Sequence, residues 1–191
     1  MRKIHQENIP TQLQAIPQWV CWKGEHKKEG RMTKVPINPN TGKKARVNDS
    51  NTWSTYDDAR SCCIKNNLDG LGFVFSADDN FIGIDLDHSI DSNTGEIEKT
   101  AQSIIKQFDS YTEISPSGNG FHILIKGKLP NGGKKSSNIE IYDKLRFFTV
   151  TGHILNGSKK DIFDRSDRLQ HFFQTCFPES SVSPAKNKSI I

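Results

Sequence analysis

The chain has 191 residues, 34% of them hydrophobic and 25% charged, and its 26 lysines and arginines against 22 aspartates and glutamates give a net charge of +4. A chain of this length can bury roughly 70% of its unfolded surface, which excludes disorder along its whole length. No run approaches the ~20 apolar residues that a membrane span needs, and the start lacks the apolar stretch of a secretory signal, so we expect a cytoplasmic protein without membrane contact.

Two strands and a helix are predicted in the first third of the chain. Gln18–Trp22 and Lys34–Ile37 read as strands joined in a hairpin, and Pro36 places the second at a sheet edge because proline cannot donate to a ladder. Ser54–Asp57 has the S-x-x-D form that caps a helix, which then runs to about Asn66.

Strands and helices are mixed in the remainder of the chain. The apolar runs 71–76 and 81–87 flank a short polar turn and are predicted to form a second hairpin. Apolar residues at helical spacing predict helices over 96–108 and 165–176. Further strands are expected at 111–114, at 121–126, and at 138–143 continuing after a short break into 146–151. Hairpins mixed with helices predict an α+β fold with a largely antiparallel sheet.

The predicted strand 81–87 carries two carboxylates on one face. The strand period of two sends its isoleucines and leucine to one side and Asp85 and Asp87 to the other. Two like charges ~6 to 7 Å apart on a strand repel unless a cation or water lies between them. The pair therefore indicates a divalent metal site, although an exposed strand face with two ordinary aspartates has the same pattern.

The loop 115–122, with the sequence SPSGNGFH, is rich in residues that let a backbone approach a ligand. Its two glycines and asparagine can turn N–H groups outward, as loops that cradle phosphates do. His122 and Lys126 then share one face of the next strand and are expected to meet the same phosphate. A plain hairpin turn followed by an edge histidine fits the same residues.

The strand 138–143 alternates again and directs Glu140 away from the core, so that it offers a third carboxylate. Arg146 opens the following strand, and its planar guanidinium suits a phosphate in bidentate fashion. The alternative for Arg146 is a salt bridge at a strand end.

Charge is segregated along the chain. Residues 19–53 carry eight basic and three acidic side chains. Residues 76–113 carry two basic and nine acidic side chains, and residues 123–160 carry eight basic and two acidic ones. An acidic centre between basic segments suits a protein that grips a polyanion while holding divalent cations. Solvated surface charge is the alternative.

The four cysteines give no sign of a zinc site. No pair among Cys21, Cys62, Cys63 and Cys176 has the C-x-x-C spacing that presents two thiolates to one metal. We expect reduced thiols in or near the core.

Three motifs occur in order on consecutive predicted strands: D-x-D at Asp85 and Asp87, S-G-x-G-x-H ending at His122, and Glu140 between two isoleucines with Arg146 beyond. Together they resemble the archaeo-eukaryotic primase superfamily, in particular the primase-polymerase domains of phages and plasmids. The resemblance covers roughly 19–152. It implies a modified RRM-like palm, with a catalytic domain over 1–177, an N-terminal module at about 12–70 and the palm at about 71–177. The serine, proline and lysine content of 178–191 predicts a flexible tail or linker there.

The resemblance also implies roles for residues at matching positions. Two Mg²⁺ or Mn²⁺ ions would be held by Asp85, Asp87 and Glu140, which with His122 would form the catalytic set. The nucleotide would be contacted by Ser117, Gly118, Asn119, His122, Arg146 and Lys34. The template would pass basic segments and stacking platforms, for which the candidates are Trp53, Trp22, Lys126, Lys134 and Lys135.

Two positions depart from the family pattern. Gly120 stands two residues before His122, where the second motif is often written S-x-H, so a serine contact must come from Ser117. Glu140 stands where many relatives have aspartate, and its longer arm changes its reach to the metals.

The implied function is DNA-templated addition of dNTP or NTP to a primer 3′-hydroxyl in the replication system of a mobile element. Nucleotides and single-stranded or primer-template DNA would be the partners, with a helicase as a further one, and primer extension is favoured over priming de novo. The same carboxylates also suit a metal-dependent nuclease, and the basic groove alone suits a catalytically silent single-stranded DNA-binding module. A helicase motor is not encoded, because G-x-x-x-x-G-K-[ST] is absent.

Overall fold

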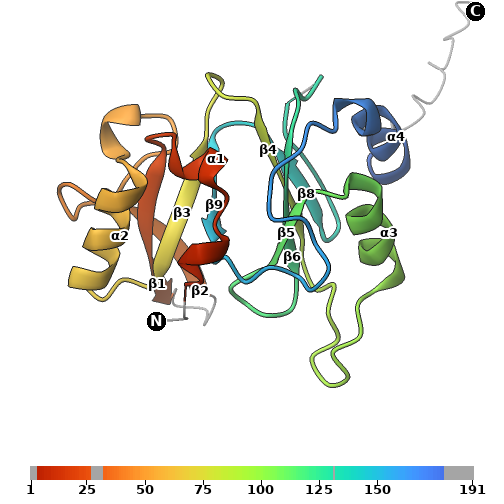
Figure 1. Ribbon diagram of the computed structural model, residues 1–191, viewed down its shortest axis with the longest axis horizontal. Helices are drawn as coiled ribbons and strands as arrows, with labels where there is room; N and C mark the ends of the chain where they lie inside the picture. The colour runs from red at the N-terminus through yellow and green to blue at the C-terminus, as the bar shows by residue number, and fades with distance from the viewer. Residues whose placement is uncertain (1–3, 27–31, 131, 179–191) are drawn as a thin grey trace, which may run out of the picture.

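The computed structural model describes residues 4–26, 32–130 and 132–178, which form an α+β fold (Figure 1). Its strands make two antiparallel sheets, with the orders β2-β1-β3-β9 and β5-β6-β4-β8-β7. The strands are β1 (Trp19–His26), β2 (Met32–Ile37), β3 (Gly70–Phe75), β4 (Phe81–Leu86), β5 (Tyr111–Ile114), β6 (Phe121–Lys126), β7 (Lys134–Ser136), β8 (Ile139–Tyr142) and β9 (Arg146–Val150). The helices are α1 (Thr11–Gln14), α2 (Tyr56–Lys65), α3 (Lys99–Phe108) and α4 (Ser166–Cys176), with short 3-10 turns at Gln6–Asn8 and Ser50–Thr52.

The two sheets lie between flanking helices. In Figure 1, α2 lies at the left beside the first sheet, and α3 and α4 lie at the right beside the second. The predicted hairpin of β1 and β2 is confirmed, and Pro36 lies on the edge strand opposite Trp22. No helix among the described residues is long and apolar enough to cross a membrane.

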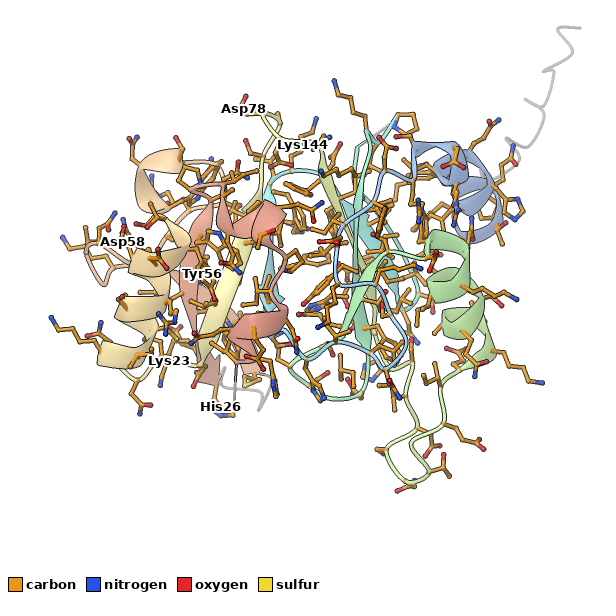
Figure 2. All side chains as sticks on the ribbon, viewed as in Figure 1. Lys23, His26, Tyr56, Asp58, Asp78 and Lys144 are labelled. Carbon is orange, nitrogen blue, oxygen red and sulfur yellow. The ribbon has the colours of Figure 1, made fainter. Side chains whose placement is uncertain are left out.

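The second predicted hairpin is wrong. β3 pairs with β1 and β9 in the first sheet, whereas β4 pairs with β6 and β8 in the second. The polar segment between them, which has Asp78 at its exposed end (Figure 2), crosses from one sheet to the other. Asp79 fixes this crossing, since its carboxylate accepts hydrogen bonds from the Gln18 side chain (2.6 Å) and from the backbone N–H groups of Ser76 (3.0 Å) and Phe81 (2.7 Å).

The second sheet has two different faces. Alternate residues of β4 and β6 pack in one apolar cluster with α3 and α4: Ile82, Ile84, Leu86, Phe121, Ile123 and Ile125. The opposite face meets the first sheet, where Gly83 allows close approach, because a Cβ there would lie 2.6 Å from the rings of Phe75 and Phe148. This division by alternation is the one that the sequence predicts.

The helices begin slightly later than predicted, and one strand is additional. α2 is capped by Thr55, whose hydroxyl accepts from the Asp58 N–H (3.2 Å), one residue after the expected cap. β7 was not predicted. The first sheet combines β1 and β2 with β3 and β9, so the expected division near residue 70 runs through that sheet. Of the expected tail, residues 179–191 lie outside the described residues.

Candidate active site

Five ionisable side chains form one row across the second sheet, one from each strand. Glu113 pairs with His122, His122 with Asp85, Asp85 with Glu140, and Glu140 with Lys135. Directly opposed residues of antiparallel strands point to the same face. We refer to these five residues as the charged row. It brings together Asp85, His122 and Glu140, which the sequence pattern predicted on three separate strands.

Asp85 lies at the centre of the charged row. Its side chain is 24% exposed, and its Oδ1 is buried without a hydrogen-bond partner among the described residues. The pKa of Asp85 is raised, chiefly by burial. The positive charges of His122 and Lys34 lower this pKa, whereas the negative charges of Asp87 and Glu140 raise it. The three predicted carboxylates and Lys34 are therefore close enough to interact electrostatically. A buried carboxylate oxygen without a hydrogen-bond partner is suited to binding a cation.

His122 is buried between two carboxylates. Its Nδ1 lies 3.0 Å from the Thr149 carbonyl oxygen and 3.4 Å from Oε1 of Glu113, while its Nε2 lies 3.8 Å from Oδ1 of Asp85. Burial by itself lowers the pKa of His122, but the hydrogen bond to Glu113 and the charges of Asp85 and Glu113 outweigh it, so that the pKa is raised. The ring thus lies in a negative environment.

Glu140 is ion-paired with Lys135 across β7 and β8. The Lys135 side chain is 59% exposed, and its hydrogen bond to Glu140 raises its pKa. Within the part of the chain that the structure describes, no three histidine, cysteine, aspartate or glutamate side chains are grouped closely enough to hold one ion. The ammonium group of Lys135 takes the place beside Glu140 that a cation would need.

The loop 115–120 is a compact turn at the end of the charged row. The Ser115 N–H donates to the Gly120 carbonyl (2.9 Å), and the N–H of Gly118, whose φ is +82°, donates to the Ser115 carbonyl (2.9 Å). Ser117 is exposed and hydrogen-bonded to the Asn119 side chain, which also lies 3.3 Å from His88. Ser117, Gly118 and Asn119 therefore lie together at the surface, with three of the loop's N–H groups already used inside it, since the Asn119 N–H donates to the Ser117 hydroxyl (3.4 Å).

Gly120 explains the absence of serine two residues before His122. A Cβ at this position would overlap the Leu86 carbonyl oxygen and lie 3.3 Å from Cα of Asp87. The loop is thus pressed against the end of the strand that carries the two aspartates.

Two predicted phosphate-binding cations lie near the site. Arg146 stacks on Tyr142, with its guanidinium carbon 4.6 Å from the ring centroid. Tyr142 follows Glu140 by two residues on β8 and so shares its face. Lys34 lies with its Nζ 5.8 Å from the centroid of Trp22, and its charge acts on both Asp85 and His122.

Four other predicted residues are not brought to the charged row. The Nζ of Lys126 lies 5.7 Å from the centroid of Phe81, and buried Leu124 separates Lys126 from His122 along β6. Lys134 lies over Phe173 of α4. The Trp53 indole donates to the Arg46 carbonyl (2.8 Å) and packs against the first sheet, where Trp22 is also buried.

Sequence reasoning missed Glu113. The signal was available, because Glu113 and His122 stand at equal distances, two residues, from the ends of the turn 115–120. In a hairpin such residues are opposed.

Comparison with known proteins gives one informative match. No family model matches the chain. Over 151 residues, 76% of its length, the chain is 41% identical to a curated protein named DNA primase-polymerase from Nitratiruptor phage NrS-1. The chain spans about a fifth (20%) of the length of that relative. The resemblance to phage primase-polymerases that the motifs predicted is therefore confirmed.

Proposed function

We propose that this chain is the nucleotidyl-transfer domain of a phage-type DNA primase-polymerase, which adds nucleotides to the 3′-hydroxyl of a primer on a DNA template. The observation that carries the proposal is the charged row, which sets Asp85 between His122 and Glu140 on neighbouring strands. The name of the 41% identical phage protein supports polymerisation as the reaction.

The second sheet is, in this proposal, the palm of an archaeo-eukaryotic primase. Its support is an antiparallel sheet with helices on one face and the three sequence motifs on the other, at the end of β4, at the start of β6 and on β8. The first sheet then forms the opposite wall of the site and contributes Lys34 and Arg146.

Asp85, Asp87 and Glu140 are the residues that would hold two Mg²⁺ or Mn²⁺ ions. The unpartnered Oδ1 of Asp85 and the carboxylate set fit hard divalent cations. Glu140 has to exchange Lys135 for the metal. Bound there, two such ions would supply Lewis acidity to the primer hydroxyl and positive charge to offset the triphosphate and the leaving pyrophosphate.

The chain's own cations would orient the triphosphate. His122 is held rigidly by its neighbours, and Lys34 and Arg146 approach from the first sheet, so that positive charges surround the carboxylates on two sides. Ser117, Gly118 and Asn119 would contact the nucleotide from the loop. The protein supplies alignment and charge and no covalent nucleophile.

DNA and nucleotides are the proposed partners, and phage or other mobile-element replication inside a host cell is the proposed setting. The basic segments on either side of the acidic centre would follow the template backbone. Trp53 and Trp22 pack within the first sheet, so template contacts would come chiefly from lysines.

The test is extension of a labelled primer-template by the chain with Mn²⁺, with and without dNTPs. Lengthening that needs dNTPs supports the proposal, shortening without them indicates the nuclease, and binding without either indicates a silent DNA-binding module.

The Asp85→Asn variant tests whether the extension activity resides at this site. We expect at least about a hundredfold loss of extension, because the variant loses the central carboxylate, with Tm unchanged within about 2 °C. Asp78→Asn makes the same chemical change in the exposed crossing loop and serves as the matched control (Figure 2). Equal activity of the two variants would remove Asp85 from the mechanism.

A further inference from the structure

Glu113 is a buried carboxylate on the same face of the second sheet as Asp85. It is 1% exposed and lies at the end of the charged row, separated from Asp85 by His122. Its Oε2 accepts hydrogen bonds from the Tyr111 hydroxyl (2.8 Å) and from the backbone N–H groups of Gly152 (2.8 Å) and Thr151 (3.0 Å). These bonds fix the carboxylate in one orientation, with Oε1 toward His122.

The surroundings of His122 settle which ring nitrogen carries a proton. Nδ1 lies 3.0 Å from the Thr149 carbonyl oxygen and 3.4 Å from Oε1 of Glu113. A carbonyl oxygen can only accept, so Nδ1 must donate, in the neutral ring as in the charged one. Nε2 is then the ring atom left on the Asp85 side, at 3.8 Å from Oδ1.

We propose that Glu113 is a positioning residue: it holds the His122 ring with its Nδ1–H directed away from the metal-ligand side, so that Nε2 is presented to the phosphates of the incoming nucleotide. This inference rests on the proposed function for the ligand of Nε2. The orientation of the ring rests on the contacts alone.

The arrangement joins three strands from two sheets. Glu113 on β5 and His122 on β6 are direct cross-strand partners, while β9 and the residues after it supply the Thr149 carbonyl and the N–H groups of Thr151 and Gly152. The His122 ring is thus held by a hydrogen bond to β9, the strand that also carries Arg146. A carboxylate behind a histidine fixes tautomer and orientation in many active sites.

A purely structural role is the competing explanation, since Glu113 also ties β5 to the residues after β9. The two roles differ in their dependence on His122. Positioning acts through the imidazole and disappears when the imidazole is absent, whereas a structural tie does not.

The first test is ¹⁵N NMR of the histidine rings in the full chain, with His122 assigned by loss of its signals in His122→Asn. We expect Nδ1 of His122 to carry a slowly exchanging, downfield-shifted proton. In Glu113→Gln the proton should stay on Nδ1, held by the Thr149 carbonyl, but exchange faster and shift upfield, because the carboxylate no longer attracts it. It should be unchanged in Tyr111→Phe, which removes one hydrogen bond to Glu113 and leaves the carboxylate. A bare Nδ1 in the parent, or an unchanged spectrum in Glu113→Gln, would overturn the proposal.

The second test is a double-mutant cycle on primer extension. Glu113→Gln should lower kcat/KM for the incoming dNTP by about 10- to 100-fold, the range found for carboxylates that orient metal-ligating histidines, with no further loss in a His122→Asn background. Equal losses in both backgrounds would show a structural tie instead. If the parent extends no primer, the proposed function fails, and the NMR measurement still decides the orientation of His122.

Discussion

Gly120 illustrates how backbone packing constrains the site at the scale of single residues. Its φ is not in the left-handed region, so the need for glycine is steric: a side chain would overlap the Leu86 carbonyl oxygen. This contact sets the loop 115–120 against Asp87. A serine at position 120 is therefore excluded by the same packing that brings the loop to the carboxylates.

Gly120→Ala should lower stability by about 1 to 3 kcal/mol, because the added methyl group overpacks a backbone contact. In a protein of this size, this corresponds to roughly 2 to 12 °C in Tm by thermal unfolding. Gly42→Ala is the control, since Gly42 has φ +69° and no neighbour within 4 Å, so that it reports backbone strain without overlap. A smaller loss at Gly120 than at Gly42 would contradict the packing argument.

Single residues of the site were predictable where strand alternation decides their direction. Asp85 and Glu140 follow from the apolar residues beside them, which must face the helices. The pairing of Glu140 with Lys135 was not predictable, because it depends on β7, a three-residue strand with no apolar alternation. Lys126 was expected beside His122, but four residues along a strand span ~13 Å, too far for one phosphate.

At the scale of elements, the crossing between β3 and β4 shows what local patterns leave open. A short polar segment between two apolar strands is typical of a hairpin, but it serves equally to connect strands in different sheets. What decides between the two is the partner of each strand. β3 and β4 each pair with at least one strand that lies more than 35 residues away in the sequence. Such pairings are not encoded in the turn.

Asp79→Ala should destabilise the protein by about 2 kcal/mol, or about 4 to 8 °C in Tm, because the half-buried carboxylate accepts three hydrogen bonds at the crossing. The control is Asp78→Ala, one residue earlier and exposed, for which we expect little change. Thermal unfolding of both variants measures the difference. Equal Tm values would mean that the crossing does not depend on Asp79.

Lys135→Ala tests the role of the edge strand β7. Since Lys135 occupies the place of a cation beside Glu140, its removal should lower the Mn²⁺ concentration for half-maximal extension, by up to about fivefold for an exposed ion pair. Lys134→Ala lies on the same strand but over Phe173, and should leave the Mn²⁺ dependence unchanged. A higher Mn²⁺ requirement in Lys135→Ala would indicate that Lys135 assists the reaction instead of competing with metal.

At the scale of the whole molecule, the two sheets share one core. A single apolar cluster joins Trp19 and Phe73 of the first sheet to Phe81, Tyr111 and Leu124 of the second. The α+β class and the helix faces were predictable from periodicity, whereas the division into two sheets was not, since it depends on which distant strands pair.

The shared core predicts one cooperative unfolding transition. The three tryptophans, Trp19, Trp22 and Trp53, all lie in or against the first sheet, so their fluorescence reports that sheet, while far-UV circular dichroism reports both. We expect the two urea-unfolding curves to coincide. Separate midpoints would show that the sheets unfold independently.

The charged row runs at right angles to the strands, so its alignment depends on their registers and, outside the tight turns that set a register, not on the lengths of the connecting segments. A slip of one residue in any strand would turn that strand's member toward the helices and dismantle the row. Added residues in a long connection such as 87–98, by contrast, leave the row in place. The exposed turn at 92–95, between β4 and α3, is accordingly a position where a reporter group can be inserted without altering the chemistry beside it.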